Sequence, residues 1–179
     1  MRITGGALRS RKLFSVESTR LRPATDRLRE TMFNILANMI DLEGSRALDL
    51  YAGTGSVGFE TISRGAGLVV FVESDRRIAS VIGRNAESLG VKGQCVIRIM
   101  DAEKYVEAAD QTFDIAYVDP PYAFNSRTHE IIEEMLRRRI VEPDGIICVE
   151  HTKNYAPPPA SLVRQKMFGE TILSFIKPE

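Results

Sequence analysis

Five short apolar runs recur between residues 46 and 149, and helical patterns separate them. The runs lie near 46–51, 68–72, 95–99, 113–118 and 145–149, and helices are expected near 57–64, 75–89, 102–109 and 128–139. Such runs are typical of parallel strands that helices cover on both faces. Two later strands, 162–168 and 171–176, flank Gly169-Glu170, which indicates a tight hairpin turn. The chain is therefore predicted to be α/β, with a Rossmann-like doubly wound, mostly parallel seven-stranded sheet and an antiparallel C-terminal edge strand.

The N-terminal part of the chain departs from this alternation. Residues 2–16 suggest short strands around Gly5-Gly6, and apolar residues at helical spacing follow between residues 28 and 39. Arg22-Pro23 marks a boundary, because the residue before a proline is disfavoured in a helix. We expect a small β-hairpin and helix extension. Residues 1–23 are then a basic N-terminal extension, and residues 24–179 are the main domain.

Positive charge is concentrated at the N-terminus, although the net charge of the chain is zero. Residues 1–29 contain eight basic and two acidic groups, a balance of +6, which leaves −6 for the rest of the chain. A basic segment on an acidic body favours a polyanionic partner. The candidate contacts are Arg2, Arg9, Arg11, Lys12, Arg20, Arg22 and Arg27, and Arg29 belongs to the same cluster.

Composition argues against several classes of protein. No apolar run approaches the roughly 20 residues of a membrane-spanning helix, and the N-terminus lacks the apolar stretch of a signal peptide. The two cysteines, Cys95 and Cys148, are expected to be reduced thiols in the core. Two histidines and no Cys-x-x-Cys pattern make a metal site unexpected. We expect a cytoplasmic protein with no membrane partner and no metal.

The segment DLYAGTGSVG (49–58) follows the first strand and contains G-x-G-x-x-G, which fits a nicotinamide dinucleotide or S-adenosylmethionine. Asp49 would repel a pyrophosphate but attract the ammonium and sulfonium groups of S-adenosylmethionine. Glu73 ends the second strand and would accept the ribose hydroxyls of either cofactor. Asp101 follows the third strand and either binds the adenine amine or caps the next helix. The predicted cofactor site also includes Ala52, Gly53, Thr54, Gly55, Ser74 and Ala102.

A second motif, Asp119-Pro120-Pro121-Tyr122, follows the apolar strand FDIAYV. It resembles the active-site motif of S-adenosylmethionine-dependent methyltransferases that methylate exocyclic amines of nucleobases. The Asp119 carboxylate and the Pro120 carbonyl would accept the two hydrogens of the amine and turn its lone pair toward the methyl group. Pro121 helps to fix the backbone, and Tyr122 offers a face on which an extruded base stacks. These four residues are the predicted catalytic residues.

Several segments together are similar to the bacterial small-subunit ribosomal RNA guanine-N2 methyltransferases, over nearly the whole chain. They are RPATDRLRETMFNIL (22–36), DLYAGTGSVGFE (49–60), SRGA (63–66), FVE (71–73) and DPPY (119–122). Tyr51 stands where that family often has phenylalanine. The resemblance implies S-adenosylmethionine as cofactor, a target guanine held by the DPPY motif, and ribosomal RNA contacts from the basic N-terminal segment. It also implies a substrate presented by an assembling small ribosomal subunit.

Three alternatives stay open at this point. An amine methyltransferase that acts on adenine or cytosine of another RNA or of DNA fits the second motif. A nicotinamide-dependent oxidoreductase fits only the glycine motif, and a non-catalytic RNA-binding module explains only the basic segment. Because the glycine motif lies beyond residue 48, we expect that removal of residues 1–20 weakens RNA binding and leaves the cofactor site intact.

Overall fold

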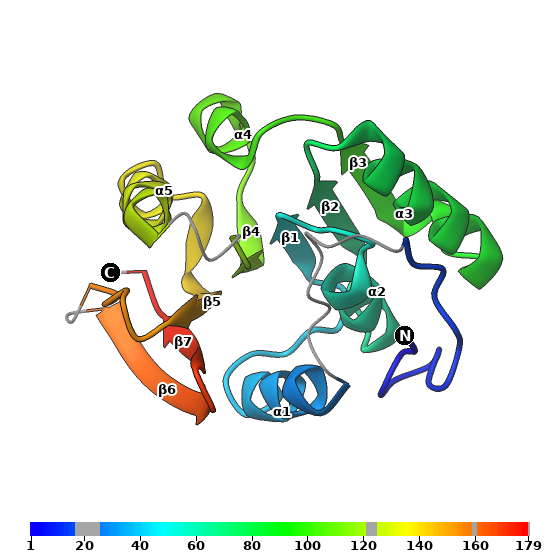
Figure 1. Cartoon of the computed structure of the whole chain (residues 1–179), viewed down its shortest axis with the longest axis horizontal. Coiled ribbons are helices and arrows are strands. Elements are labelled where there is room, and N and C mark those ends of the chain that lie inside the picture. Colours follow the sequence, from blue (N-terminus) through cyan, green and yellow to red (C-terminus); the bar gives the residue numbers. More distant parts are fainter. Residues whose placement is uncertain (17–25, 121–124, 159–160, 179) are drawn as a thin grey trace.

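The structure of the chain, a computed structural model, describes residues 1–16, 26–120, 125–158 and 161–178. Its helices are α1 (Asp26–Leu36), α2 (Ser56–Ser63), α3 (Arg76–Leu89), the 3-10 turn η1 (Lys92–Gln94), α4 (Ala102–Ala108) and α5 (Asn125–Arg137). Its strands are β1 (Arg46–Leu50), β2 (Leu68–Val72), β3 (Cys95–Arg98), β4 (Phe113–Val118), β5 (Val141–Thr152), β6 (Leu162–Phe168) and β7 (Thr171–Ile176). The predicted alternation of strands and helices is confirmed (Figure 1). No helix in these four ranges is long and apolar enough to cross a membrane.

The seven strands form one sheet in the order β3-β2-β1-β4-β5-β7-β6, as the α/β prediction required. Strands β1 to β5 are parallel, and β7 runs antiparallel between β5 and β6. The C-terminal strand is thus one position inside the edge, and β6 lies at the edge. The difference in burial between β7 and β6 explains why β7 lies inside the edge. Strand β7 reads TILSFI and has four buried residues at its end, whereas five successive residues of β6 are exposed.

Helices cover both faces of the sheet, and the alternation of side chains along each strand supplies both cores. Val69 and Phe71 of β2 pack in a core with α1, α2 and α3, whereas Val70 and Val72 pack in a core with α4 and α5. Figure 1 shows α1, α2 and α3 on one side of the strands, and α4 and α5 on the other. Because both faces are buried, the strands read as continuous apolar runs.

The N-terminal segment, residues 1–16, packs on the first of these cores. Ile3 and Leu13 are buried in the core with α1, α2 and α3, and a single antiparallel bridge joins Arg2 to Lys12. The backbone N–H of Leu8 donates to the Ser63 hydroxyl at 2.9 Å. The predicted hairpin is therefore one bridge around a loop, which buried side chains attach to the helix face.

A buried ion pair joins α1 to α2. Arg29 and Glu60 are both fully buried, and the Arg29 Nε lies 3.4 Å from Glu60 Oε2. Asp26 and Arg64 pair with Arg29 and Glu60 respectively, each at 2.9 Å. The backbone N–H and hydroxyl of Thr4 each donate to the Glu60 carboxylate at 2.7 Å. Arg29 is therefore a structural residue, which corrects its assignment to the basic surface cluster.

We expect Arg29→Met to lower the free energy of unfolding by about 3 kcal/mol, because it leaves a buried carboxylate without one of its cations. The matched control is Arg27→Met on the same helix. Arg27 is exposed, so its replacement should change stability by no more than about 0.5 kcal/mol. Urea unfolding of the two variants measures the difference. Equal midpoints would show that the buried pair contributes nothing to stability.

Candidate active site

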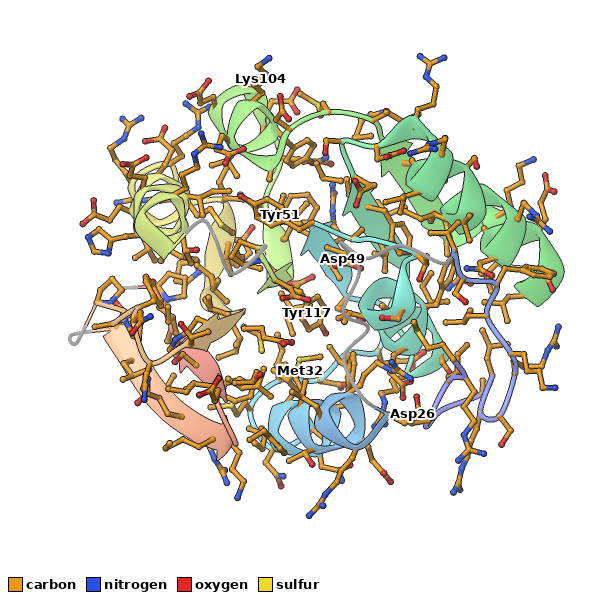
Figure 2. All side chains as sticks on the ribbon, viewed as in Figure 1. Asp26, Met32, Asp49, Tyr51, Lys104 and Tyr117 are labelled. Carbon is orange, nitrogen blue, oxygen red and sulfur yellow. The ribbon has the colours of Figure 1, made fainter. Side chains whose placement is uncertain are left out.

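A cavity of about 190 Å³ opens at the carboxyl ends of β1 and β4. These strands are neighbours, and Leu50 pairs with Val118 at their ends. Figure 2 shows Asp49, Tyr117 and Met32 one after another in the centre of the molecule, between β1 and α1. The lining comprises Asp49, Tyr51, Ala52, Gly53, Thr54, Ser56 and Val57 from β1 to α2; Tyr117, Val118 and Asp119 from β4; Cys148, Glu150 and Leu173 from β5 and β7; Met32 from α1; and Met1, Ser15 and Val16.

The glycine loop between β1 and α2 has backbone geometry that depends on glycine. Gly53 and Gly55 have φ angles of 57° and 83°, in the left-handed region that favours glycine. A Cβ atom on Gly58 would lie 2.2 Å from the Phe71 ring, so the absence of a side chain lets α2 pack closely on β2. The loop and the first turn of α2 therefore form a wall of the cavity made largely of backbone.

Asp49 is a buried carboxylate in this wall, only 3% exposed. The backbone N–H of Gly58 donates to its Oδ2 at 2.9 Å. Burial raises the pKa of Asp49 to about 7, and the charge of Glu73 raises it further, whereas the hydrogen bond from Gly58 lowers it. Among the described residues no salt bridge supplies Asp49 with a cation, so the carboxylate fits a cationic group bound in the cavity.

Five predicted cofactor residues are outside the cavity lining: Gly55 in the glycine loop, and Glu73, Ser74, Asp101 and Ala102, which follow β2 and β3. The Glu73 carboxylate accepts hydrogen bonds from the backbone N–H groups of Gly53 at 3.0 Å and Asp75 at 2.8 Å. Asp101 makes no capping hydrogen bond with its side chain, and its carboxylate lies 3.5 Å from Lys104 Nζ. Asp101 thus stands at the N-cap position of α4 without the side-chain hydrogen bond of a cap, and it is exposed.

The second motif lies directly after β4, next to the glycine loop. Asp119 is half-buried and Pro120 is buried, whereas Pro121 and Tyr122 lie outside the described residues. Burial raises the pKa of Asp119 well above its usual range, and the negative charges of Glu150 and Asp49 raise it further. Three carboxyl groups therefore line one cavity, and a bound cation would lower the pKa of Asp49 and Asp119.

Sequence reasoning missed several residues of the cavity. Glu150 and Cys148 come from β5, and a carboxylate at the end of an apolar run was a signal that could have identified Glu150. Tyr117 lines the cavity with its hydroxyl 3.1 Å from that of Thr61. Met1, Ser15 and Val16 carried no signal, because only the tertiary structure brings them to the glycine loop.

Asn85 of α3 explains why the N-terminal segment reaches this loop. The backbone N–H of Phe14 donates to Asn85 Oδ1 at 2.7 Å, and Asn85 Nδ2 donates to the carbonyls of Phe14 and Thr54, both at 3.1 Å. Asn85 is buried, so these bonds are shielded from water. Removal of residues 1–20 would take away part of the cavity wall. The expectation that the cofactor site is independent of this segment is therefore wrong.

The predicted RNA-binding residues differ in their surroundings. Arg9, Lys12 and Arg27 are exposed. Arg2 is exposed too but lies 3.4 Å from the Asp26 carboxylate, and Arg11 donates to the Ser88 carbonyl at 2.7 Å. Arg20 and Arg22 lie outside the described residues. The cluster thus keeps four exposed cations without an ion pair among the described residues, and one of them, Arg11, is hydrogen-bonded to a backbone carbonyl. In the same ranges no group of three or more His, Cys, Asp and Glu side chains is arranged to hold a metal ion.

Comparisons with known proteins agree with this geometry. Residues 1–177 match the family described as "Conserved hypothetical protein 95". The Haemophilus influenzae protein named "Ribosomal RNA small subunit methyltransferase D" is 34% identical over 175 residues, which cover 94% of this chain and 89% of that protein. The solved structure of a hypothetical protein from Thermus thermophilus is 28% identical, covers 99% of each chain and gives a TM-score of 0.84.

A more distant structure shares the fold. The RNA methyltransferase from Salinibacter ruber, solved in complex with S-adenosyl-L-homocysteine, is 14% identical and gives a TM-score of 0.70. It covers 88% of this chain and 94% of its own. At this identity the likeness concerns the arrangement of the sheet and its helices.

The affinity for S-adenosylhomocysteine should rise with pH through the pKa of Asp49, which is about 7. The amino group of this ligand is cationic and is expected to bind the ionised carboxylate, so a rise from pH 6 to pH 8 should tighten binding about tenfold. Asp49→Asn should bind more weakly and lose most of this pH dependence. The control Asp75→Asn, at a residue that does not line the cavity, should keep it. Calorimetry at both pH values measures the affinity of each variant. If Asp49→Asn keeps the wild-type pH dependence, the Asp49 carboxylate is not its cause.

Proposed function

The chain belongs to the family described as conserved hypothetical protein 95, and on that premise we propose that it methylates the exocyclic amine N2 of a guanine in small-subunit ribosomal RNA, with S-adenosylmethionine as cofactor. The observation that carries the proposal is the single cavity that both Asp49 and Asp119 line. One carboxylate suits the cationic cofactor and the other suits the amine. The relative from Haemophilus influenzae, named for activity on ribosomal RNA of the small subunit, supports the choice of substrate.

The residues around the glycine loop fit the cofactor. A buried carboxylate, Asp49, lacks a cation among its described contacts, and Gly53, whose positive φ favours glycine, lines the cavity beside it. Glu73, at the end of β2, offers oxygens for the ribose, and Asp101 offers an acceptor for the adenine amine. Ala52, Thr54, Ser74 and Ala102 complete the proposed cofactor site. When bound, S-adenosylmethionine supplies an electrophilic methyl group.

The residues after β4 position the nucleophile. The lone pair of a guanine amine is delocalised into the ring, so the amine needs orientation more than it needs a strong base. The Asp119 carboxylate and the Pro120 carbonyl accept its two hydrogens, and Asp119 stabilises the positive charge that develops on nitrogen. Pro121 and Tyr122 would hold the backbone and stack on an extruded base.

The basic N-terminal segment is the proposed contact to the ribosomal RNA phosphates, within an assembling small subunit. Support comes from Arg9, Lys12 and Arg27, which are exposed. They lie on the segment and helix that also contribute Met1, Ser15, Val16 and Met32 to the cavity wall. Phosphates bound there would bring the RNA to the mouth of the site.

A strain that lacks this gene should regain one N2-methylguanosine of its small-subunit ribosomal RNA when the wild-type chain is supplied. Asp119→Ala should fail to restore it, because an acceptor at the reacting amine is lost, and should cut turnover in vitro by about a hundredfold or more. The variant should still bind S-adenosylhomocysteine. The control Asp110→Ala removes an exposed carboxylate after α4 and should behave as wild type. Mass spectrometry of nucleosides is the readout, and an unchanged profile on deletion contradicts the proposed function.

Replacement of Arg9, Lys12 and Arg27 by serine should weaken RNA binding and flatten its dependence on salt. Each lost phosphate contact should reduce the slope of log affinity against log salt by roughly 0.7 to 0.9. The control replaces Lys104, Arg137 and Arg138 by serine. Lys104 lies on α4, Arg137 ends α5 and Arg138 directly follows it, across the sheet from the N-terminal segment. The control changes the net charge equally and should keep the wild-type slope. The idea fails if both triple variants show the same affinity and slope.

A further inference from the structure

Glu150 is a second carboxylate beside the proposed amine site. It follows Val149 on β5, and Val149 pairs with Val118 of β4, so Glu150 and Asp119 come next on two neighbouring strands. Parallel neighbours lie about 4.8 Å apart. Both side chains line the same cavity. The structure therefore places two carboxyl groups side by side at the carboxyl edge of the sheet.

The alternation of β5 explains why Glu150 faces the cavity. Cys148 packs in the core with α1, α2 and α3, whereas Val149 packs in the core with α4 and α5. Glu150 follows Cys148 on the first face, and Leu173 of β7 is its register partner. Both Cys148 and Leu173 are buried. The Glu150 carboxylate thus has buried apolar neighbours on β5 and β7 and lines the cavity together with Asp119.

The two carboxyl groups are close enough to interact electrically. The negative charge of Glu150 is the largest charge effect on Asp119 and raises its pKa, and it also raises the pKa of the buried Cys148 thiol. The two carboxyl groups repel each other, so holding them side by side costs electrostatic energy. Such a pair of acceptors suits a ligand that presents two neighbouring hydrogen-bond donors.

We propose that Glu150 accepts the N1–H of the target guanine and thereby selects guanine over the other bases. This inference rests on the proposed function. Asp119 and Pro120 are proposed to hold the N2 amine of the guanine, and Glu150 is assigned to N1–H on the same edge of that base. Glu150 is a specificity-determining residue that touches the substrate, separate from the four residues of the DPPY motif.

The chemistry of the Watson–Crick edge supports this assignment. An extruded base is read by hydrogen bonds on that edge. Guanine presents N1–H directly beside its N2 amine, so two adjacent acceptors match two adjacent donors. Adenine presents the lone pair of N1 at the same place, and cytosine the lone pair of N3. A carboxylate facing a lone pair is repelled and loses its hydrogen bond in a partly buried site, which disfavours both bases.

The test compares guanosine with 2,6-diaminopurine riboside and 2-aminopurine riboside at the target nucleotide. Both analogues keep the 2-amino group and lack N1–H, and they differ from each other at C6. Small ribosomal subunits reconstituted with RNA that carries one of the three bases are the substrates, and methyl incorporation gives kcat/KM for each. Wild type should prefer guanosine by on the order of a hundredfold or more over both analogues. Comparable rates on all three bases overturn the proposal, whatever any variant does.

Glu150→Gln supplies the second arm of the test. Its amide can accept from N1–H or donate to a lone pair, so the preference for guanosine should shrink to about tenfold or less. The control Glu170→Gln removes one negative charge from the exposed turn between β6 and β7 and should keep the wild-type preference. S-adenosylhomocysteine binding confirms that each variant is folded.

The remaining outcomes separate the two proposals. If Glu150→Gln keeps the wild-type preference, Glu150 does not read N1–H. If it binds the cofactor product normally but methylates none of the three bases, Glu150 acts in the chemistry and the selectivity role is overturned. If wild type does not methylate the guanosine substrate, the proposed function itself fails, and the inference fails with it.

Discussion

The parallel pairing of β1 with β4 determines where this molecule can hold a ligand. The chain leaves β1 toward β2 and β3 on one side of the sheet, and it leaves β4 toward β5 on the other. Residues at the carboxyl ends of the two strands line one cavity, as is typical of the place where the order of an open α/β sheet reverses. Because Asp49 pairs with Tyr117, the glycine loop and Asp119, the first residue of the DPPY motif, line one cavity although they are far apart in the sequence.

This arrangement has an electrostatic cost that is itself informative. Asp49, Asp119 and Glu150 lie in one cavity. Burial raises the pKa of both aspartates, and nearby negative charges raise it further, from Glu73 at Asp49 and from Glu150 and Asp49 at Asp119. Elsewhere in the same core the chain shows how a buried carboxylate is stabilised, since Glu60 has two arginine partners and two hydrogen bonds from Thr4. The aspartates in the cavity have no comparable set of cations among the described residues. A bound ligand would therefore have to stabilise the ionised forms of these two aspartates. This is expected for a site that takes a cationic ligand and an amine.

Much of the fold could be predicted because buried parallel strands are apolar on both faces. The predicted runs 68–72, 113–118 and 171–176 coincide with β2, β4 and β7. The C-terminal strand was predicted at the edge, whereas β7 lies one position inside it, since its last four residues are buried and five successive residues of β6 are exposed. Arg29 was misassigned, although its spacing from Phe33 and Leu36 puts it on the buried stripe of α1. Only its pairing with Glu60, on another helix, makes an arginine tolerable there, and local sequence does not report that pairing.

Residues of the candidate site that lie at the end of a strand could be predicted from the sequence. Residues that only tertiary contacts bring to the cavity could not. Asp49 and Asp119 follow apolar runs, and Glu150 does so too, so one rule accounts for all three carboxylates. The N-terminal wall depends on Asn85, whose hydrogen bonds hold the backbone of Phe14 and the carbonyl of Thr54 at once. The same side chain thus fixes the segment proposed to bind RNA and the loop proposed to bind the cofactor. A displacement of that segment is necessarily a displacement of the cavity wall, so the proposed RNA contact and the proposed cofactor contact depend on one structural element.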